Sequence, residues 1–261
     1  MEYDEMKRQI DQLILQYVGD VSVYAVSLSD HRILFDQRSA QPVRSASIIK
    51  VLIMIAVLEV IAENNYELTS MISVKQNQIL SDSEIFQTEE RIVTIEKLLT
   101  WMIAYSDNTS ANVLIDLIGI DAVNNSINKM NLSQTLMQRK MLDFDAIDRG
   151  SDNFTSVQDM YIVFEGIFSD SILTPELCKK AREILLKQEI KDQFLRFITD
   201  DIQVFHKTGD LNYLNHDVGV FRIKGNDYFL GVFCWNTVDI DGNKKFVGLL
   251  AQIFYEYMKT V

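Results

Sequence analysis

The sequence predicts an α/β protein of the α+β kind, in which both ends of the chain build one antiparallel sheet and a helical lobe is inserted between them. Three observations lead to this class. Stretches rich in β-branched and aromatic residues occur towards both ends of the chain. Apolar residues at helical spacing fill the long stretch between them, and further helical patterns lie at the two termini. We expect a single domain over 1–261, with a sheet lobe from 1–40 plus 200–261 and a helical lobe from 45–190.

The first 190 residues begin with strands and continue as helices. Residues 3–18 have the pattern of an amphipathic helix, and strands are expected at 21–28 and 33–36. The turn-like Ser29-Asp30-His31-Arg32 joins these strands into a hairpin. From residue 47 to about 186 no strand-like alternation is found, and the helical segments lie near 48–63, 94–105, 109–118, 120–130, 156–168 and 175–188.

After residue 200 the period returns to that of strands. The expected strands are 202–206, 218–223 and 228–235, and Lys224-Gly225-Asn226 joins the last two as a tight turn. A final helix is expected from about 244 to 258. The terminal helices are therefore expected to flank a sheet that the two ends share.

Composition bounds the possible functions. A chain of 261 residues that is 48% hydrophobic buries a sizeable core without disulfides, and Cys178 and Cys234 are expected to be buried thiols. A net charge of −12 argues against a broad nucleic-acid-binding surface, because phosphate contacts need clustered Lys and Arg. The longest apolar run, 48–62, is interrupted by Lys50 and Glu59, so we expect no membrane span.

The start of the chain lacks the basic, apolar and small-residue regions of a secretory signal. A cytoplasmic protein is expected if Met1 is the native start, and a secreted one if a leader preceded it.

Three short motifs follow one another along the chain, namely Ser47-Ile48-Ile49-Lys50, Ser106-Asp107-Asn108 and Lys207-Thr208-Gly209. Each is weak alone, because Ser126-Ile127-Asn128-Lys129 repeats the first pattern and Ser151-Asp152-Asn153 repeats the second. Their surroundings separate the copies.

Ser47 opens a helix that is apolar almost all round, so its backbone N–H lies at the positive end of the helix dipole, where an oxyanion can be held. Lys50 shares its face, and burial and the dipole both disfavour the lysine charge. A neutral amine that accepts the serine proton is one interpretation; a lysine whose head reaches solvent is the other. Ser126 has no buried helix after it, so Lys129 is expected to be a solvated residue.

Ser106-Asp107-Asn108 forms a short polar corner between two apolar helices. There Ser106 is suited to relay a proton and Asn108 to bind a substrate amide. Alternatively, Asp107 or Asn108 only caps the second helix. The copy at Ser151 is interpreted as loop and cap, because Thr155 and Ser156 are typical of a helix start.

Lys207-Thr208-Gly209 occurs once, at the end of a β-branched and aromatic run. A cation on a strand edge suits a carboxylate, and glycine allows the substrate to approach closely. The alternative is a strand end followed by an ordinary turn.

With the three motifs in this order, the chain resembles the class A β-lactamases and their penicillin-binding-protein relatives over nearly its whole length. Arg44-Ser45-Ala46-Ser47-Ile48-Ile49-Lys50-Val51-Leu52 is similar to the nucleophile helix of that family, and Tyr105-Ser106-Asp107-Asn108-Thr109-Ser110-Ala111-Asn112 to its second motif. The resemblance implies a sheet lobe packed on a helical lobe, with the site between them.

The resemblance also implies a role for each motif residue. Ser47 would attack a β-lactam or related acyl carbonyl, Lys50 would activate it, and Ser106 would pass a proton to the leaving nitrogen. Asn108, Lys207, Thr208 and Gly209 would bind the substrate. The backbone N–H groups of Ser47 and Asp210 would form the oxyanion hole.

Two departures from the family stand out. In Gln138-Arg139-Lys140-Met141-Leu142-Asp143-Phe144-Asp145, Met141 stands where the family carries the glutamate that activates the deacylating water. Asp143 or Asp145 is a possible substitute base, although each is also expected as a structural loop residue. Asp210 replaces a small residue, and it either weakens the binding of an anion or points outward.

No metal or organic cofactor is expected, since His31, His206 and His216 lack metal-type spacing with the cysteines. A Ser-His-Asp hydrolase is set aside because the Gly-x-Ser-x-Gly elbow is missing. The leading hypothesis is a serine β-lactamase-like hydrolase acting on a small-molecule acyl substrate, with no nucleic-acid or membrane partner. A cytoplasmic amidase or esterase and a penicillin-binding sensor without turnover are the alternatives.

Overall fold

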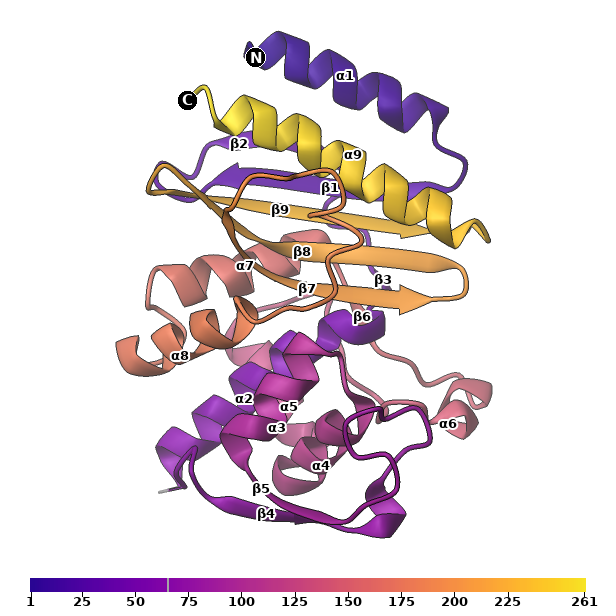
Figure 1. The fold of residues 1–261 in the computed structure, drawn as a ribbon, viewed down its shortest axis with the longest axis vertical. Coiled ribbons are helices and arrows are strands. Elements are labelled where there is room, and N and C mark those ends of the chain that lie inside the picture. The colour runs from indigo at the N-terminus through magenta and orange to yellow at the C-terminus, as the bar shows by residue number, and fades with distance from the viewer. Residues whose placement is uncertain (65) are drawn as a thin grey trace.

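Both ends of the chain contribute to one five-stranded antiparallel sheet, with strand order β2-β1-β9-β8-β7 (Figure 1). The computed structural model describes residues 1–64 and 66–261. The strands of the sheet are β1 (Asp20–Ser27), β2 (Ile33–Gln37), β7 (Gln203–Leu211), β8 (Leu214–Ile223) and β9 (Asn226–Trp235). The N-terminal β1 pairs with the C-terminal β9, with Val23 opposite Val232. The predicted fold class is confirmed.

The hairpin between β8 and β9 is as tight as the sequence predicts. Its two linking residues, Lys224 and Gly225, have φ of 51° and 83°. Two successive positive φ values match the twist of the flanking strands, and glycine adopts such a value without steric cost.

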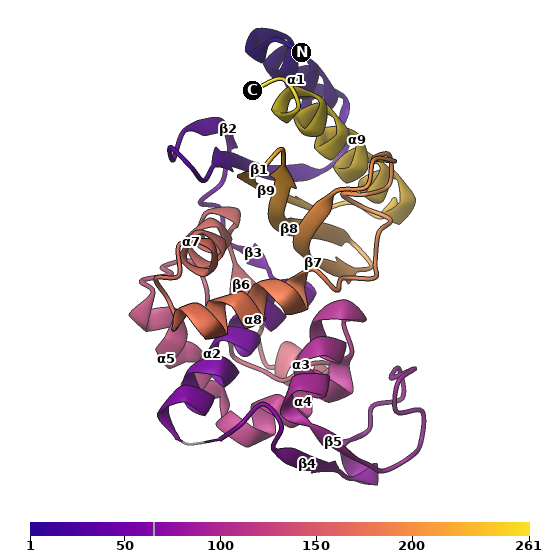
Figure 2. The same cartoon turned by 60° about the vertical axis from the view of Figure 1, so that its left-hand side comes forward.

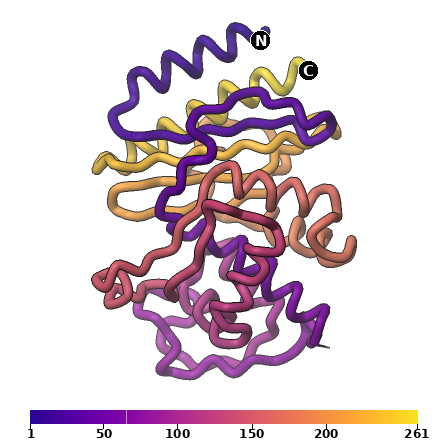
Figure 3. Tube along the Cα trace, turned by 180° about the vertical axis from the view of Figure 1, so that it is seen from behind, coloured from indigo at the N-terminus to yellow at the C-terminus, as the bar shows by residue number. Residues whose placement is uncertain are grey.

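The two terminal helices, α1 (Tyr3–Gln16) and α9 (Ile240–Met258), lie together over one face of the sheet (Figure 2). Met6 and Ile10 of α1 and Phe254 of α9 are fully buried in the core that these helices form with the sheet. The chain termini also meet, since Thr260 Oγ1 donates to the carbonyl of Met1 at 3.0 Å (Figure 3). This layer forms a core separate from that of the helical lobe.

The opposite face of the sheet packs on the helical lobe. Its helices are the 3₁₀ helices η1 (Ala46–Ile49) and η2 (Gln76–Gln78) and the α-helices α2 (Lys50–Glu63), α3 (Ile95–Ala104), α4 (Asn108–Ile118), α5 (Ile120–Lys129), α6 (Phe144–Asp148), α7 (Val157–Phe168) and α8 (Pro175–Leu185). Every predicted helix is present. Helix α2 is central, and all its residues from 50 to 58 are buried. A helix enclosed on all sides holds whatever stands at its N-terminus rigidly.

Two small sheets in the helical lobe were not predicted. They pair β4 (Met71–Val74) with β5 (Arg91–Thr94), and β3 (Val43–Arg44) with β6 (Phe154–Thr155). The strands have two to four residues, too few for an alternating pattern to appear, and β5 runs directly into α3. The expectation that no strand lies between 47 and 186 is therefore wrong.

The structure also bears on the cysteines, the strand of the third motif and the helix lengths. Cys178 and Cys234 are buried free thiols, as predicted. Strand β7 does not end at the third motif but continues to Leu211, so the alternative of a strand end at Gly209 is wrong. Among the helices of residues 1–64 and 66–261, none combines the length and apolar character that a bilayer span requires.

Candidate active site

The first motif lies where the two lobes meet. Ser47 belongs to η1, directly before α2, and its side chain is half-buried, whereas Lys50 is fully buried. Ala46, just before the serine, has a φ of 45°, a conformation that L-residues rarely adopt. The chain is thus turned sharply into a buried helix, with the serine hydroxyl at the turn.

Lys50 joins the first two motifs. Its Nζ lies 3.0 Å from Ser47 Oγ and 3.2 Å from Ser106 Oγ. It also contacts the carbonyl of Ser106 at 2.5 Å and Asn108 Oδ1 at 2.7 Å. The two hydroxyls that the sequence predicts as nucleophile and proton relay therefore share one amine.

The surroundings of Lys50 favour its neutral form. Burial lowers its pKa well below the usual value, and Lys207 lowers it further, while Asp107 and Asp82 oppose the shift. The two shortest contacts go to carbonyl oxygens, which only accept. A neutral amine donates both N–H groups to them, and its lone pair is then free to accept from Ser47. The interpretation of Lys50 as a solvated residue is wrong.

The second motif is a strained corner between α3 and α4. Ser106 has a φ of 57°, and Asp107 caps α4, since its Oδ1 accepts from the Ser110 backbone N–H at 2.6 Å. Its other oxygen accepts from Ser83 Oγ at 2.5 Å. Asp107 thus caps the helix, so the capping interpretation is confirmed for this residue. Its neighbours Ser106 and Asn108 both contact Lys50.

The third motif closes the site from the sheet side. Lys207 is fully buried on edge strand β7, and its Nζ donates to Ser106 Oγ at 2.9 Å and to the Thr208 carbonyl at 2.6 Å. Burial lowers the pKa of Lys207 to about 7, although Asp210 and Asp217 oppose this shift. Thr208 follows with a buried side chain.

Gly209 explains how strand and nucleophile come so close. A Cβ on it would lie 3.0 Å from Ile48 Cγ1 and 3.3 Å from the Cβ of Ala46. Because β7 packs directly on η1 at this point, only a residue without a side chain fits easily. The backbone around Gly209 is therefore held against the segment that carries Ser47.

A cavity of about 390 Å³ opens beside Ser106 and Asn108. The residues that line it include Asp82, Glu84 and Glu189. Asp82 Oδ2 accepts from Asn108 Nδ2 at 2.6 Å and thereby orients that amide. Sequence reasoning missed Asp82, because it lies in an irregular stretch whose pattern does not indicate where its side chain points.

The two extra motif copies lie elsewhere. Lys129 is exposed and pairs with Glu59 and Glu63, at 3.4 Å and 3.3 Å. Ser156 caps α7 by accepting from the Asp159 backbone N–H at 3.0 Å. The expected exposure of Lys129 and the expected helix cap at Ser156 are confirmed. Asp152, however, also forms ion pairs with Arg44 and Arg139.

Comparison with known proteins places this arrangement in a family. The family model described as beta-lactamase enzyme family matches residues 5–258. The chain belongs to this family. It is a β-lactamase-type serine hydrolase, and the family resemblance that the motifs indicated is confirmed.

Individual relatives are distant in sequence but similar over the whole length. A beta-lactamase of Bacteroides uniformis is 19% identical over 99% of this chain and 93% of that protein. The structure of a class A beta-lactamase from Bacteroides cellulosilyticus DSM 14838 matches with a TM-score of 0.90 and 19% identity, covering 99% of each chain. A mutant of PBP-A, solved as an acyl-enzyme complex with penicillin G, matches with a TM-score of 0.88 and 19% identity over 99% of this chain and 97% of that one.

The loop to which the resemblance assigned a deacylating glutamate holds Met141 in the core. Asn112 clamps its backbone, since Oδ1 accepts from the Met141 N–H at 2.8 Å and Nδ2 donates to its carbonyl at 3.1 Å. The Met141 side chain is only 7% exposed. Asp143 caps α6 by accepting from the Ala146 N–H at 3.0 Å, and Asp145 is exposed. Asp143 is therefore a helix cap, and within residues 1–64 and 66–261 no side-chain hydrogen bond or ion pair holds Asp145.

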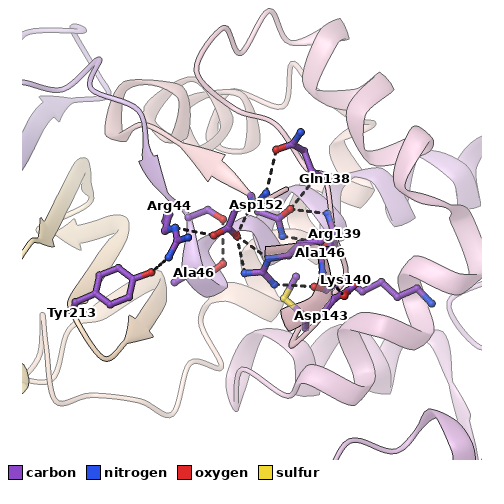
Figure 4. Close-up of polar contacts among 12 residues, drawn as sticks. Arg44, Ala46, Gln138, Arg139, Lys140, Asp143, Ala146, Asp152 and Tyr213 are labelled. Atoms are coloured by element: carbon purple, nitrogen blue, oxygen red, sulfur yellow. Dashed lines mark hydrogen bonds and ion pairs between the residues drawn. The ribbon is translucent and has the colours of Figure 1, made fainter. Parts of the chain in front are cut away.

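Asp152 anchors this loop to the nucleophile segment (Figure 4). Its Oδ1 contacts Arg139 Nε at 2.8 Å and Nη2 at 2.7 Å, and its Oδ2 lies 2.8 Å from Arg44 Nε. Arg44 also reaches the Tyr213 hydroxyl, in the turn between β7 and β8. Sequence reasoning missed this connection, because residues 44, 139, 152 and 213 are far apart in the chain and form no motif.

The two buried histidines do not join the site. His206 Nδ1 contacts Asp217 Oδ1 at 2.9 Å, and the carbonyl of Arg44 accepts from His216 Nε2 at 3.0 Å. Burial lowers the pKa of His216 to about 4, so its ring is neutral at physiological pH. Across the described chain, no group of three His, Cys, Asp or Glu side chains is arranged to hold a metal ion.

Proposed function

We propose that this protein opens β-lactam amides through an acyl-enzyme on Ser47. The observation that carries the proposal is the position of Lys50 Nζ between two hydroxyls, 3.0 Å from Ser47 Oγ and 3.2 Å from Ser106 Oγ. A base must lie within hydrogen-bond reach of the proton that it takes, and this amine reaches both the nucleophile and the relay.

In the acylation step, Ser47 Oγ attacks the lactam carbonyl carbon and its proton passes to Lys50. The C–N bond then breaks, Ser106 Oγ gives its proton to the leaving nitrogen, and Lys50 returns a proton to Ser106. The developing oxyanion is held by the backbone N–H groups of Ser47 and Asp210. Support comes from Gly209, whose close approach to Ile48 brings these two backbone segments together.

Substrate groups are bound by the polar side chains around this pair. Lys207, with Thr208 beside it, binds the substrate carboxylate, and Asn108 binds the acyl amide. Lys207 Nζ lies 2.9 Å from Ser106 Oγ, so a carboxylate bound there would hold the scissile bond near the relay.

Release of the acyl group is proposed to be slow. Hydrolysis needs a base beside the ester, and Met141, a buried apolar side chain, occupies the position of that base in the family. This observation favours the second candidate function, a penicillin-binding protein or sensor that stays acylated. A relative solved as an acyl-enzyme with penicillin G is consistent with both candidates.

Intact-mass measurement after mixing with benzylpenicillin tests the proposal. We expect the mass to increase by one penicillin, and Ser47→Ala to abolish the increase. A chromogenic cephalosporin measures turnover in parallel. If neither a penicillin adduct nor cephalosporin turnover appears while Ser47 reacts with a fluorophosphonate probe, the amidase or esterase alternative replaces the proposal. If Ser47 also fails to react with the probe, acyl transfer at this residue is excluded.

Met141→Glu separates slow turnover from absent acylation. A carboxylate at this position supplies the missing base, so we expect the acyl-enzyme to decay faster, by tenfold or more given that general-base catalysis contributes about 10²–10⁴-fold. Met141→Gln is the matched control, because glutamine has the length and shape of glutamate but carries a neutral amide that cannot take the proton. Equal lifetimes of the two acyl-enzymes would contradict the assignment of this position.

A further inference from the structure

Asp210, directly after the third motif, carries a carboxylate that is clamped on the side of β7 away from the nucleophile. Its Oδ1 accepts from Gln193 Nε2 at 2.8 Å and from Asn215 Nδ2 at 2.9 Å. Its Oδ2 lies 3.2 Å from Lys244 Nζ. The Asp210 side chain therefore points outward, as one of the two alternatives from the sequence expected, and three polar side chains bind its carboxylate there.

The clamp continues into the outer helical layer. Asn215 Oδ1 accepts from Asn243 Nδ2 at 2.9 Å, and Asn243 Oδ1 accepts from the Tyr17 hydroxyl at 2.8 Å. Asn215 is fully buried and Asn243 nearly so, at 0% and 1% exposure. A hydrogen-bonded chain therefore runs from Tyr17, the residue after α1, through α9 and β8 to β7. Figure 1 shows α1, α9, β8 and β7 in this order from the top of the molecule downwards.

Buried amides of this kind fix geometry, because breaking one bond leaves a partner without water. On the opposite side of the strand, Gly209 is pressed against Ile48. The peptide between Gly209 and Asp210 is thus held from both sides. Its N–H is one of the two donors that the proposed function assigns to the oxyanion hole.

We propose that Asp210 is a positioning residue for acylation, whose clamped carboxylate fixes the peptide N–H that receives the oxyanion. This inference rests on the proposed function. Asp210 does not touch the substrate; its effect passes through its own backbone. A small residue could not make these contacts, which here join β7 to Gln193, to Asn215 of β8 and to Lys244 of α9.

The test measures acylation of the full-length protein by benzylpenicillin in Asp210→Ala and Asp210→Asn. The alanine removes the clamp; the asparagine keeps the shape but offers Lys244 and the two amides a neutral partner with only one acceptor atom. Because small misplacements of an oxyanion donor cost up to about 10²-fold, we expect the acylation rate constant to fall about tenfold to a hundredfold. The dissociation constant of the non-covalent complex should stay unchanged.

Phenylboronic acid supplies a readout that general destabilisation does not move. Ser47 Oγ adds to boron, its proton passes to Lys50, and the tetrahedral anion occupies the oxyanion hole. In both Asp210 variants the affinity for phenylboronic acid should fall by the same factor as the acylation rate constant.

Asp192→Asn is the matched control. Asp192 Oδ2 also binds Lys244 Nζ, at 2.6 Å, and within the described residues Asp192 makes no side-chain hydrogen bond or ion pair to β7. We expect wild-type acylation from this variant, and an equal loss would assign the effect to Lys244 instead.

The outcomes distinguish a failure of the proposed function from a failure of the positioning role of Asp210. If the wild type itself is not acylated, the proposed function fails. If the wild type is acylated and both Asp210 variants match it, or if their loss lies in non-covalent binding alone, the positioning role is overturned. Failure of both variants to fold would make Asp210 a stability residue and would also overturn it.

Discussion

Ser106 shows at the scale of one residue how the site is held in an unfavourable conformation. Its φ of 57° lies in the left-handed region, where a residue with a Cβ has a cost of roughly 1–2 kcal/mol. Its hydroxyl is bound by both Lys50 and Lys207, at 3.2 Å and 2.9 Å. Glycine would relieve the backbone but remove the hydroxyl that contacts both lysines and that the proposed function uses as a proton relay.

The variants Ser106→Gly and Ser106→Ala separate the two contributions. Both lack the hydroxyl, and both should lose acylation by about 10²-fold or more. The glycine variant should nevertheless be more stable than the alanine variant by about 1 kcal/mol, because only glycine adopts this φ without strain. Denaturant unfolding measures the difference.

Ser169 serves as the reference position for this comparison, since its φ is −89°. There the glycine variant should not exceed the alanine variant in stability. Equal stability of the two Ser106 variants would show that the corner stores no strain.

At the scale of an element, the loop between α5 and α7 has little regular structure and depends on one carboxylate. Asp152 binds Arg139 through two nitrogens and lies against Arg44, and the Asp152 and Arg139 side chains are 7% and 9% exposed. The Asn153 carbonyl accepts from the Ser45 N–H at 2.9 Å, so the same loop supports the nucleophile segment. A buried charge that loses its partner is costly, because water cannot replace it.

Asp152→Asn should therefore lower the free energy of unfolding by about 3 kcal/mol, as expected for a buried pair that loses one partner. Limited proteolysis should cut the loop 138–153 sooner than in the wild type. Glu63→Gln removes a carboxylate from the exposed pair with Lys129 and should leave both measurements nearly unchanged. If cleavage of the loop became faster while the free energy of unfolding stayed the same, the loop would open independently of the fold.

At the scale of the whole molecule, the site takes one lysine from each lobe. Lys50 comes from the helical lobe and, in the proposed function, must be neutral to act as a base. Lys207 comes from the sheet and, in the same proposal, must be charged to bind a carboxylate. Burial lowers the pKa of both, that of Lys207 to about 7. Packing the lobes together thus sets the pH range in which the two states coexist.

The kcat/KM for acylation by benzylpenicillin should fall as the pH rises through about 7, because Lys207 then loses the proton that binds the anion. The loss should appear in KM, and an uncharged phenyl ester, which has no carboxylate, should lack this limb. The acidic limb belongs to protonation of Lys50 and should appear with both substrates. Identical basic limbs for the two substrates would contradict the role of Lys207.

Much of this molecule could be predicted from local sequence patterns. The period of apolar residues indicated the shared sheet, the terminal helices and the helices of the inner lobe, because each long element buries a face with its own repeat. The surroundings of the motifs separated Ser47 from Ser126, since only Ser47 begins an apolar helix. The four-residue strands β4 and β5 gave no such signal, because they are too short to show a repeat.

The sequence by itself determined the fold class and the residues of the three motifs, since these depend on local pattern and order along the chain. Only the tertiary structure decided that Lys50 lies between Ser47 and Ser106, that Asp82 orients Asn108, and that Asp210 turns outward to Gln193, Asn215 and Lys244. These contacts join residues that are distant in the chain. Burial and side-chain direction depend on how the two lobes pack, and no local pattern carries that information.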